Sequence, residues 1–153
     1  MHGRISYLED FQVGEGWVSA PVTLDETSIV AFAKANDLQP MPVDPDWAST
    51  GPFGTLIASG WQVAALSMRL FIEVGGYGRT PLLGLGVKEL CWLMPVKAGD
   101  TLTVERDLVE VTRSASRPDR GAISTRVSVR NQHGVEVLTM VSMGRVQARS
   151  DGS

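Results

Sequence analysis

The chain of 153 residues has a single cysteine, Cys91, only two histidines and no excess of positive charge. One cysteine excludes an intrachain disulfide and favours a reducing compartment, so we expect a cytoplasmic protein. The formal net charge of −3 argues against a nucleic-acid-binding protein, which normally carries a basic face. We therefore expect no nucleic-acid partner.

Long hydrophobic runs are missing as well. The longest apolar stretch, residues 56–72, includes two serines, a glutamine and an arginine, so it is too short and too polar to span a bilayer. The opening residues, MHGRISYLEDF, lack the apolar segment of a secretory signal. We expect neither a membrane span nor a signal peptide.

Motifs for common cofactors are also absent. No spacing of His, Cys, Asp and Glu resembles a metal site, and the sequence has neither a P-loop nor a Gly-x-Ser-x-Gly nucleophile elbow. The run Gly84-Leu85-Gly86 is too short to indicate dinucleotide binding. We therefore expect no metal and no cofactor.

The sequence does contain a helical part followed by a strand-rich part. Residues 27–36 and 59–73 place apolar side chains at helical spacing, and the second segment is apolar nearly all round, as in a buried helix. A short strand is predicted at 18–23, before these helices. Four segments rich in Val, Thr and Leu, separated by turn formers, follow them: 82–93, 101–111, 122–130 and 135–146.

This order predicts an α+β fold in which an antiparallel sheet wraps around a central apolar helix. No linker or repeat divides the chain, so we expect a single domain over residues 1–148 and a frayed tail at 149–153. Residues 37–45 hold three prolines and are predicted not to be helical. One helical turn is expected at 44–49.

Two residues are candidates for chemistry. Asp37 ends the first predicted helix and precedes the rigid proline segment, which would hold its carboxylate; ordinary helix termination is the alternative. Gly60 opens the apolar helix, whose first N–H groups lack intrahelical partners and carry the positive end of the helix dipole. A thioester carbonyl placed there would be polarised as in an oxyanion hole, although Gly60 could equally serve only close packing.

Residues 37–45 read DLQPMPVDP and residues 56–60 read LIASG. The first window resembles a motif of the MaoC-like dehydratase and (R)-specific enoyl-CoA hydratase family: Asp, two variable residues, Pro, a variable residue, His, a variable residue, Asp, Pro. This chain has Pro42 at the histidine position. The second window resembles the family's apolar pair and His-Gly at the start of the central helix, with Ser59 in place of histidine. The resemblance covers nearly the whole chain and implies a hotdog fold.

The resemblance also implies reversible hydration of a 2-enoyl thioester. In the family, the Asp and His jointly activate one water, and the N–H of the helix-opening Gly binds the thioester oxygen. Carried over, Asp37 is the base that orients the water and Gly60 is the oxyanion donor, while no residue of the motif takes the histidine role. The loss of one acid–base group typically lowers a rate roughly 10²–10⁴-fold, so weakened activity is expected. The residues expected to bind substrate are Asn36, Pro42, Ser59 and Trp61.

Two other functions stay open. The chain could be a non-catalytic acyl-CoA-binding protein, or the partner subunit of a heteromeric dehydratase whose other chain carries the histidine. It could also be a hotdog thioesterase with Asp37 as base or nucleophile. The expected ligand is a thioester of coenzyme A or of acyl carrier protein. A homodimer is expected, because a lone curved sheet leaves an edge exposed and this family usually closes its site with the neighbouring protomer.

Overall fold

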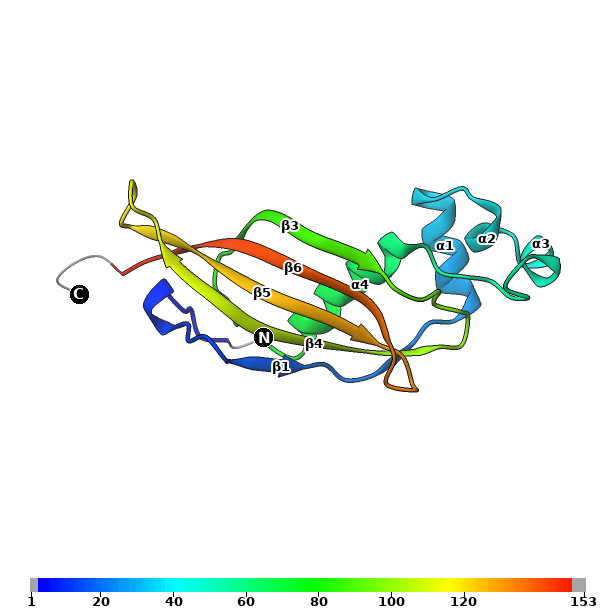
Figure 1. Cartoon of the computed structure of the whole chain (residues 1–153), viewed down its shortest axis with the longest axis horizontal. Helices are drawn as coiled ribbons and strands as arrows, with labels where there is room; N and C mark the ends of the chain where they lie inside the picture. The colour runs from blue at the N-terminus through cyan, green and yellow to red at the C-terminus, as the bar shows by residue number, and fades with distance from the viewer. Residues whose placement is uncertain (1–2, 150–153) are drawn as a thin grey trace.

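The computed structural model describes residues 3–149, which form one antiparallel sheet, a central helix and a group of three helices at one end (Figure 1). The strands are β1 (Gly16–Val18), β2 (Val22–Thr23), β3 (Leu83–Trp92), β4 (Thr101–Arg113), β5 (Arg120–Arg130) and β6 (Glu136–Gln147). The helices are the 3-10 turn η1 (Leu8–Asp10), α1 (Glu26–Asn36), α2 (Pro40–Val43), α3 (Pro45–Thr50) and α4 (Gly60–Glu73).

The three longest strands form consecutive hairpins. The sheet order is β1-β4-β5-β6-β3, and the short β2 also pairs with β4. The turn from β5 to β6 is closed by Asn131, whose Oδ1 accepts hydrogen bonds from the N–H groups of His133 and Val135 at 2.9 and 3.1 Å. Gly134 supplies the positive φ of +74° that this turn requires. Local turn chemistry therefore fixes the strand pairing that the sequence predicted.

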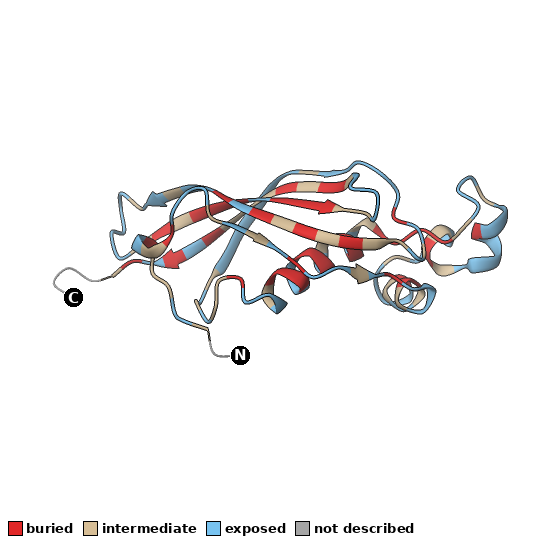
Figure 2. Ribbon diagram, turned by 90° about the horizontal axis from the view of Figure 1, so that it is seen from below, coloured by how far each residue is buried: buried red, intermediate tan, exposed pale blue. Residues whose placement is uncertain are grey.

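The central helix α4 packs against the inner face of β4 and β5. Its buried side chains include Val63, Leu66 and Leu70, which join Val104 and Val127 of the sheet in the main core. Figure 2 shows α4 running along one face of the sheet, with buried residues concentrated on the helix and the central strands. The predicted α+β hotdog architecture, a sheet around a central apolar helix, is confirmed.

The edge strand β3 is unusual because its side chains are exposed on both faces. It pairs with β6 along one edge only, and nine of its ten residues are exposed. Several of these are large and apolar, among them Leu83, Leu85 and Val87. The helix α4 also leaves Trp61 and Met68 exposed. The single chain thus covers only part of the apolar surface that its sequence provides.

Two local expectations were wrong. Residues 40–43 form a helical turn, although residues 37–45 were predicted not to be helical. Pro40 occupies the first position of α2, where its missing N–H needs no partner and its fixed φ suits the helix. The strand predicted at 18–23 is divided into β1 and β2, because Pro21 has no N–H to donate to β4.

The remaining expectations concern the ends of the chain and membrane spans. Arg149 belongs to the predicted tail, but its N–H donates to Glu9 and its guanidinium to Asp10, at 3.0 and 2.7 Å. The other tail residues, 150–153, and His2 lie outside the described residues. Among residues 3–149, no helix has the length and apolar character needed to cross a membrane.

Candidate functional site

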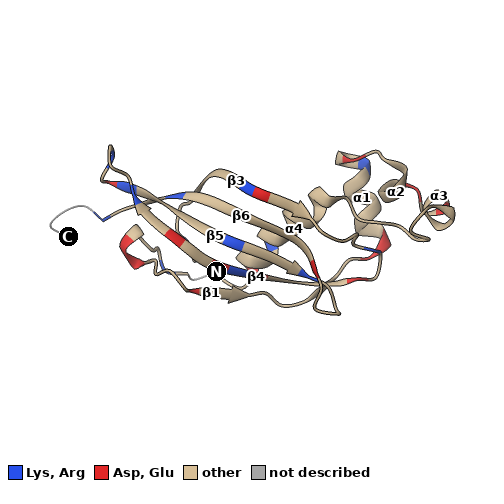
Figure 3. Ribbon diagram, in the orientation of Figure 1, with Lys and Arg blue, Asp and Glu red and all other residues tan. Residues whose placement is uncertain are grey.

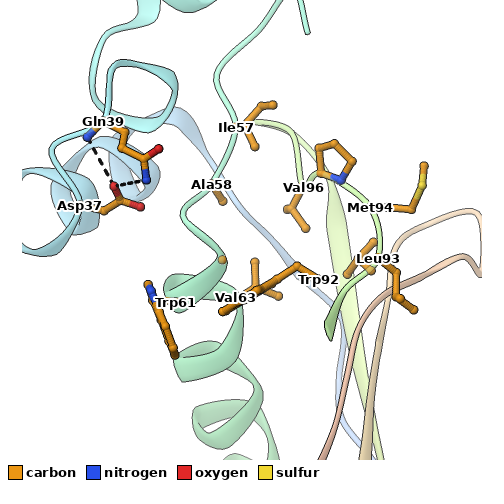
Figure 4. Close-up of a pocket in the computed structure, with 13 residues that line it drawn as sticks. Asp37, Gln39, Ile57, Ala58, Trp61, Val63, Trp92, Leu93, Met94 and Val96 are labelled. Atoms are coloured by element: carbon orange, nitrogen blue, oxygen red, sulfur yellow. Dashed lines mark hydrogen bonds between the residues drawn. The ribbon is translucent and has the colours of Figure 1, made fainter. Parts of the chain in front are cut away.

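A cavity of about 400 Å³ opens where the end of α1, the start of α4 and the end of β3 meet (Figure 4). Both residues predicted to carry chemistry, Asp37 and Gly60, line it. The rest of the lining is mainly apolar: Gln39, Ile57, Ala58, Trp61, Val63, Trp92, Leu93, Met94, Pro95, Val96 and Val137. The fold therefore brings together residues that are far apart in the sequence.

Three backbone and side-chain contacts hold the walls of this cavity in place. The Gln62 side chain of α4 donates to the backbone oxygen of Ser28 in α1 at 3.2 Å, which fixes the two helices relative to each other. The N–H of Ile57 donates to Met41 of α2 at 3.3 Å, and the N–H of Ala58 donates to Val96 at 2.8 Å. These bonds position the segment that leads into α4.

The Asp37 side chain is held by its neighbours. Asp37 is the C-cap of α1, and its N–H donates to Ala33 O at 2.8 Å. Its Oδ1 accepts a hydrogen bond from the side-chain amide of Gln39 at 2.9 Å, as Figure 4 shows. The backbone N–H of Gln39 adds a longer contact of 3.4 Å. The carboxylate is thus both a helix terminus and part of the cavity wall.

The buried hydroxyl of Ser59 lies at the start of α4. Ser59 is the N-cap residue of α4, but its side chain makes no capping bond. Within residues 3–149, Ser59 Oγ has no partner in hydrogen-bonding geometry. The pKa of the Asp37 carboxyl is held below its usual range by Ser59, which has the larger effect, and by the Gln39 amide. Because the Ser59 hydroxyl forms no hydrogen bond among the described residues, it lowers this pKa through its dipole.

The start of α4 offers free donors to the cavity. The first bonds of the helix run from the N–H groups of Gln62 and Val63 to Ser59 O, at 3.0 and 3.3 Å. None of the hydrogen bonds found in residues 3–149 uses the N–H groups of Gly60 or Trp61. Because these N–H groups sit at the positive end of the helix dipole, they suit an oxygen that gains negative charge.

Two tryptophans form the outer wall. The rings of Trp61 and Trp92 meet edge to face, with centroids 4.9 Å apart and planes at 79°. Trp92 also rests on Gly60, since a Cβ built on Gly60 would lie only 2.5 Å from Trp92 Nε1. Close packing therefore accounts for part of the requirement for glycine at this position.

Of the four residues predicted to bind substrate, Trp61 lines the cavity, whereas Asn36, Pro42 and Ser59 do not. Asn36 is exposed, and its side-chain amide donates to Phe32 O at 3.2 Å. Pro42 is buried within α2. Neither residue lines the cavity, and the exposed His133 of the β5–β6 turn does not line it either. The imidazole expected from the motif has no substitute among the described residues of this wall.

Gln39 and the segment from Trp92 to Pro95 also line the cavity, although none of them was predicted as a site residue. Gln39 occupies a variable position of the first motif, so only its hydrogen bond to Asp37 identifies it. Trp92 comes from a strand far along the chain. Among residues 3–149, no group of His, Cys, Asp and Glu side chains has the arrangement of a metal site.

Comparison with known proteins identifies the family of this chain. A family model described as "MaoC like domain" matches residues 10–131. The chain belongs to this family. It is 33% identical over 132 residues to the uncharacterized protein YdeM of Bacillus subtilis, a match that covers 86% of this chain and 92% of YdeM.

Two other MaoC-like relatives extend the comparison. The chain is 32% identical over 120 residues to 3-hydroxyacyl-thioester dehydratase Z of Mycobacterium tuberculosis, covering 77% of this chain and 78% of that protein. The crystal structure of a MaoC-like dehydratase from Rhodospirillum rubrum superposes with a TM-score of 0.83 at 36% identity, covering 95% of this chain and 99% of that one. The MaoC-like relationship therefore extends over sequence and fold alike.

Proposed function

We propose that this MaoC-like protein is a slow hydratase and dehydratase of acyl thioesters, adding water reversibly to a 2-enoyl-CoA. The observation that carries the proposal is that the Asp37 carboxylate and the free N–H groups at the start of α4 open on one apolar cavity. The 3-hydroxyacyl-thioester dehydratase that it resembles acts on the same class of compound.

A lone carboxylate can complete the reaction. Asp37 accepts a proton from a water while the water oxygen forms a bond to C3 of the enoyl group. The electron pair of the C2–C3 double bond moves towards the thioester oxygen, where the Gly60 N–H stabilises the resulting enolate. The protonated Asp37 then returns its proton to C2, so that one water is added in total.

The low pKa of Asp37 explains why the reaction should be slow. A carboxyl group whose pKa lies below the usual range is ionised at neutral pH, but it is a weak base. An imidazole with a pKa near 6.5 would be better matched to the task. The proposed rate is therefore below that of a site with both the Asp and the His.

The same features favour a second candidate, an acyl-CoA-binding protein without turnover or a subunit whose partner supplies the imidazole. Pro42 cannot donate, accept or titrate through its side chain, and it lies outside the cavity. In this alternative the chain binds acyl-CoA and gains activity only with a His-bearing relative.

Charge at the cavity favours coenzyme A over acyl carrier protein as the thioester carrier. Residues 25–50, which include α1 to α3, carry five acidic side chains and one cation, Lys34. Figure 3 shows red segments on α1 and α3 and on the loops around them. The acidic residues are Asp25, Glu26, Asp37, Asp44 and Asp46. An acidic carrier protein docked on this surface would meet like charges over a wide area, which disfavours association. A small thioester can direct its phosphates away from these helices.

We further propose that two copies pair through the free edges of β3, and that the protein works in the cytoplasm, as its single cysteine favours. The exposed apolar residues of β3 and α4 support the homodimer. A second copy would add a continuous sheet and cover the apolar side of α4. The cavity lies at the end of β3, so the second copy would also enclose its mouth.

The function is tested with crotonyl-CoA and longer 2-enoyl-CoAs. Loss of the enoyl absorbance without release of free thiol is the expected result. Thiol release would instead show a thioesterase. Binding of acyl-CoA with neither reaction would favour the binding protein or the heteromeric subunit, and co-purification with a His-bearing relative would separate those two.

A further inference from the structure

The indole of Trp92 lies directly beside the N–H groups that begin α4. A Cβ built on Gly60 would be 2.5 Å from Trp92 Nε1 and 2.6 Å from Cε2, so the nitrogen-bearing edge of the ring rests on Gly60. Trp92 is the last residue of β3 and pairs with Leu138 of β6. The sheet and the helix thus place an indole nitrogen next to the predicted oxyanion donor.

The Trp92 N–H is an open donor. None of the hydrogen bonds found across residues 3–149 uses it, and the side chain lines the cavity while remaining 44% exposed. An indole nitrogen can only donate, so this group needs an acceptor from outside the chain. A carbonyl or enolate oxygen held by Gly60 is an acceptor of the required kind.

The ring is also held in one orientation. Trp61 packs edge to face against it, and the two rings stand at 79° to each other. Gly60 blocks the other side, because there is no room between the ring and the helix backbone for even one methyl group. A donor that is fixed before substrate arrives needs no reorganisation when charge develops.

We propose that Trp92 is a further catalytic residue, whose Nε1–H donates a second hydrogen bond to the thioester oxygen beside that of Gly60. The inference rests on the proposed thioester chemistry of this cavity. Trp92 keeps its proton throughout and only stabilises the charge that moves onto oxygen when the enolate forms. Two donors on that oxygen compensate in part for the weak base at Asp37.

The test uses acetoacetyl-CoA, a thioester whose enolate absorbs in the near ultraviolet and which needs no hydration step. Wild type should bind it with an increased fraction of enolate. Trp92→Phe keeps an aromatic ring over Gly60 but removes the N–H, and it should lower the enolate-to-keto ratio of the bound ligand at least ~10-fold. Trp47→Phe, an exposed tryptophan of α3 that does not line the cavity, should leave the ratio unchanged.

A thermal unfolding scan shows whether Trp92→Phe preserves the fold. With the fold intact, an unchanged enolate ratio would overturn the role of Trp92, and so would a wild type that enriches no enolate. Hydration is measured separately on crotonyl-CoA, where Trp92→Phe should reduce kcat more than it changes KM. If wild type hydrates nothing but still enriches the enolate through Trp92, the proposed function fails while the second donor stands.

Discussion

At the scale of single residues, the pKa of Asp37 is lowered by two neighbours, Ser59 and Gln39. Ser59 stands at a motif position, whereas Gln39 stands at a variable one and is recognised only by its 2.9 Å bond to the carboxylate. Sequence reasoning could therefore find Asp37 and Gly60, but not the amide that holds Asp37. It also selected Asn36, Pro42 and Ser59, because a position in or beside a motif does not reveal which side chains line the cavity.

The lowered pKa of Asp37 predicts the pH dependence of hydration. A base must be ionised to accept a proton, so the rate should stay level from neutral pH down to the ordinary carboxyl range, about pH 4, and fall only below it. Ser59→Ala removes the larger of the influences that lower the pKa, so the acid limb should move to higher pH. The kcat/KM for crotonyl-CoA between about pH 3 and pH 8 measures both profiles. An inflection near pH 6.5 that Ser59→Ala does not move would instead point to a histidine.

Pro42→His restores the group that the family motif has at this position. Because Pro42 is buried in α2 and does not line the cavity, the imidazole has to turn out of the helix to reach Asp37. We expect it to do so and to share the proton transfer with Asp37, so that hydration of crotonyl-CoA rises at least ~10-fold. The gain should disappear when Asp37→Ala is added, since both groups act on one water. Pro40→His is the matched control: it replaces the exposed proline of the same helix, whereas Pro42 is the buried one, so its imidazole stays in solvent and should bring no gain.

Equal gains from Pro42→His and Pro40→His would mean that loosening α2, rather than proton transfer, raises the rate. A gain from Pro42→His that survives Asp37→Ala would place the chemistry on a different group.

At the scale of elements, the helices and strands follow from local patterns, while the site follows from contacts between elements. The four long strands and α4 were predicted because their apolar spacing and turn residues are local signals. The helical turn α2 was missed because proline is unfavourable inside a long helix, yet acceptable in the first turn of a short one. The contact of Trp92 with Gly60 joins β3 to α4 and has no local signal at all.

The contact between Gly60 and Trp92 predicts how a methyl group added at position 60 changes the stability of the fold. Gly60→Ala should destabilise the fold by about 1–3 kcal/mol, because the new Cβ overlaps the Trp92 ring and the strand end must shift. The better helix propensity of alanine, about 1 kcal/mol, offsets only part of this. Urea unfolding monitored by circular dichroism gives the difference.

A double-mutant cycle identifies the cause. In a Trp92→Leu background the cost of Gly60→Ala should shrink, because the smaller side chain leaves room for the methyl group. An equal cost in both backgrounds would mean that position 60 needs glycine for a reason other than the indole.

At the scale of the whole molecule, the two edges of the sheet differ. The sheet is closed by β1 and β2 beyond β4, whereas β3 ends it with a long free edge and exposed apolar side chains. A free edge of this length invites pairing with another strand. A second copy is the partner that we propose, since it offers the same edge in return.

The homodimer is tested by introducing a charged side chain near the middle of β3. A two-fold axis across β3 would bring two copies of residue 87 close together, so Val87→Lys should convert a dimer into a monomer. Light scattering during size-exclusion chromatography at micromolar concentration reports the mass. Val109→Lys, an exposed valine on β4 with β5 and β6 between it and β3, should leave the dimer intact. A monodisperse wild-type monomer would contradict the proposed assembly.

The central claim is that Asp37 acts on a water beside a thioester held at the start of α4, and one comparison tests it most directly. Hydration of crotonyl-CoA is measured for wild type, for Asp37→Asn and for Asp46→Asn, which removes an exposed carboxylate of α3 outside the cavity. We predict slow hydration by wild type and by Asp46→Asn, and a loss of roughly 10²-fold or more in Asp37→Asn, whose amide cannot accept the proton. Hydration that is equal in all three proteins would contradict the account.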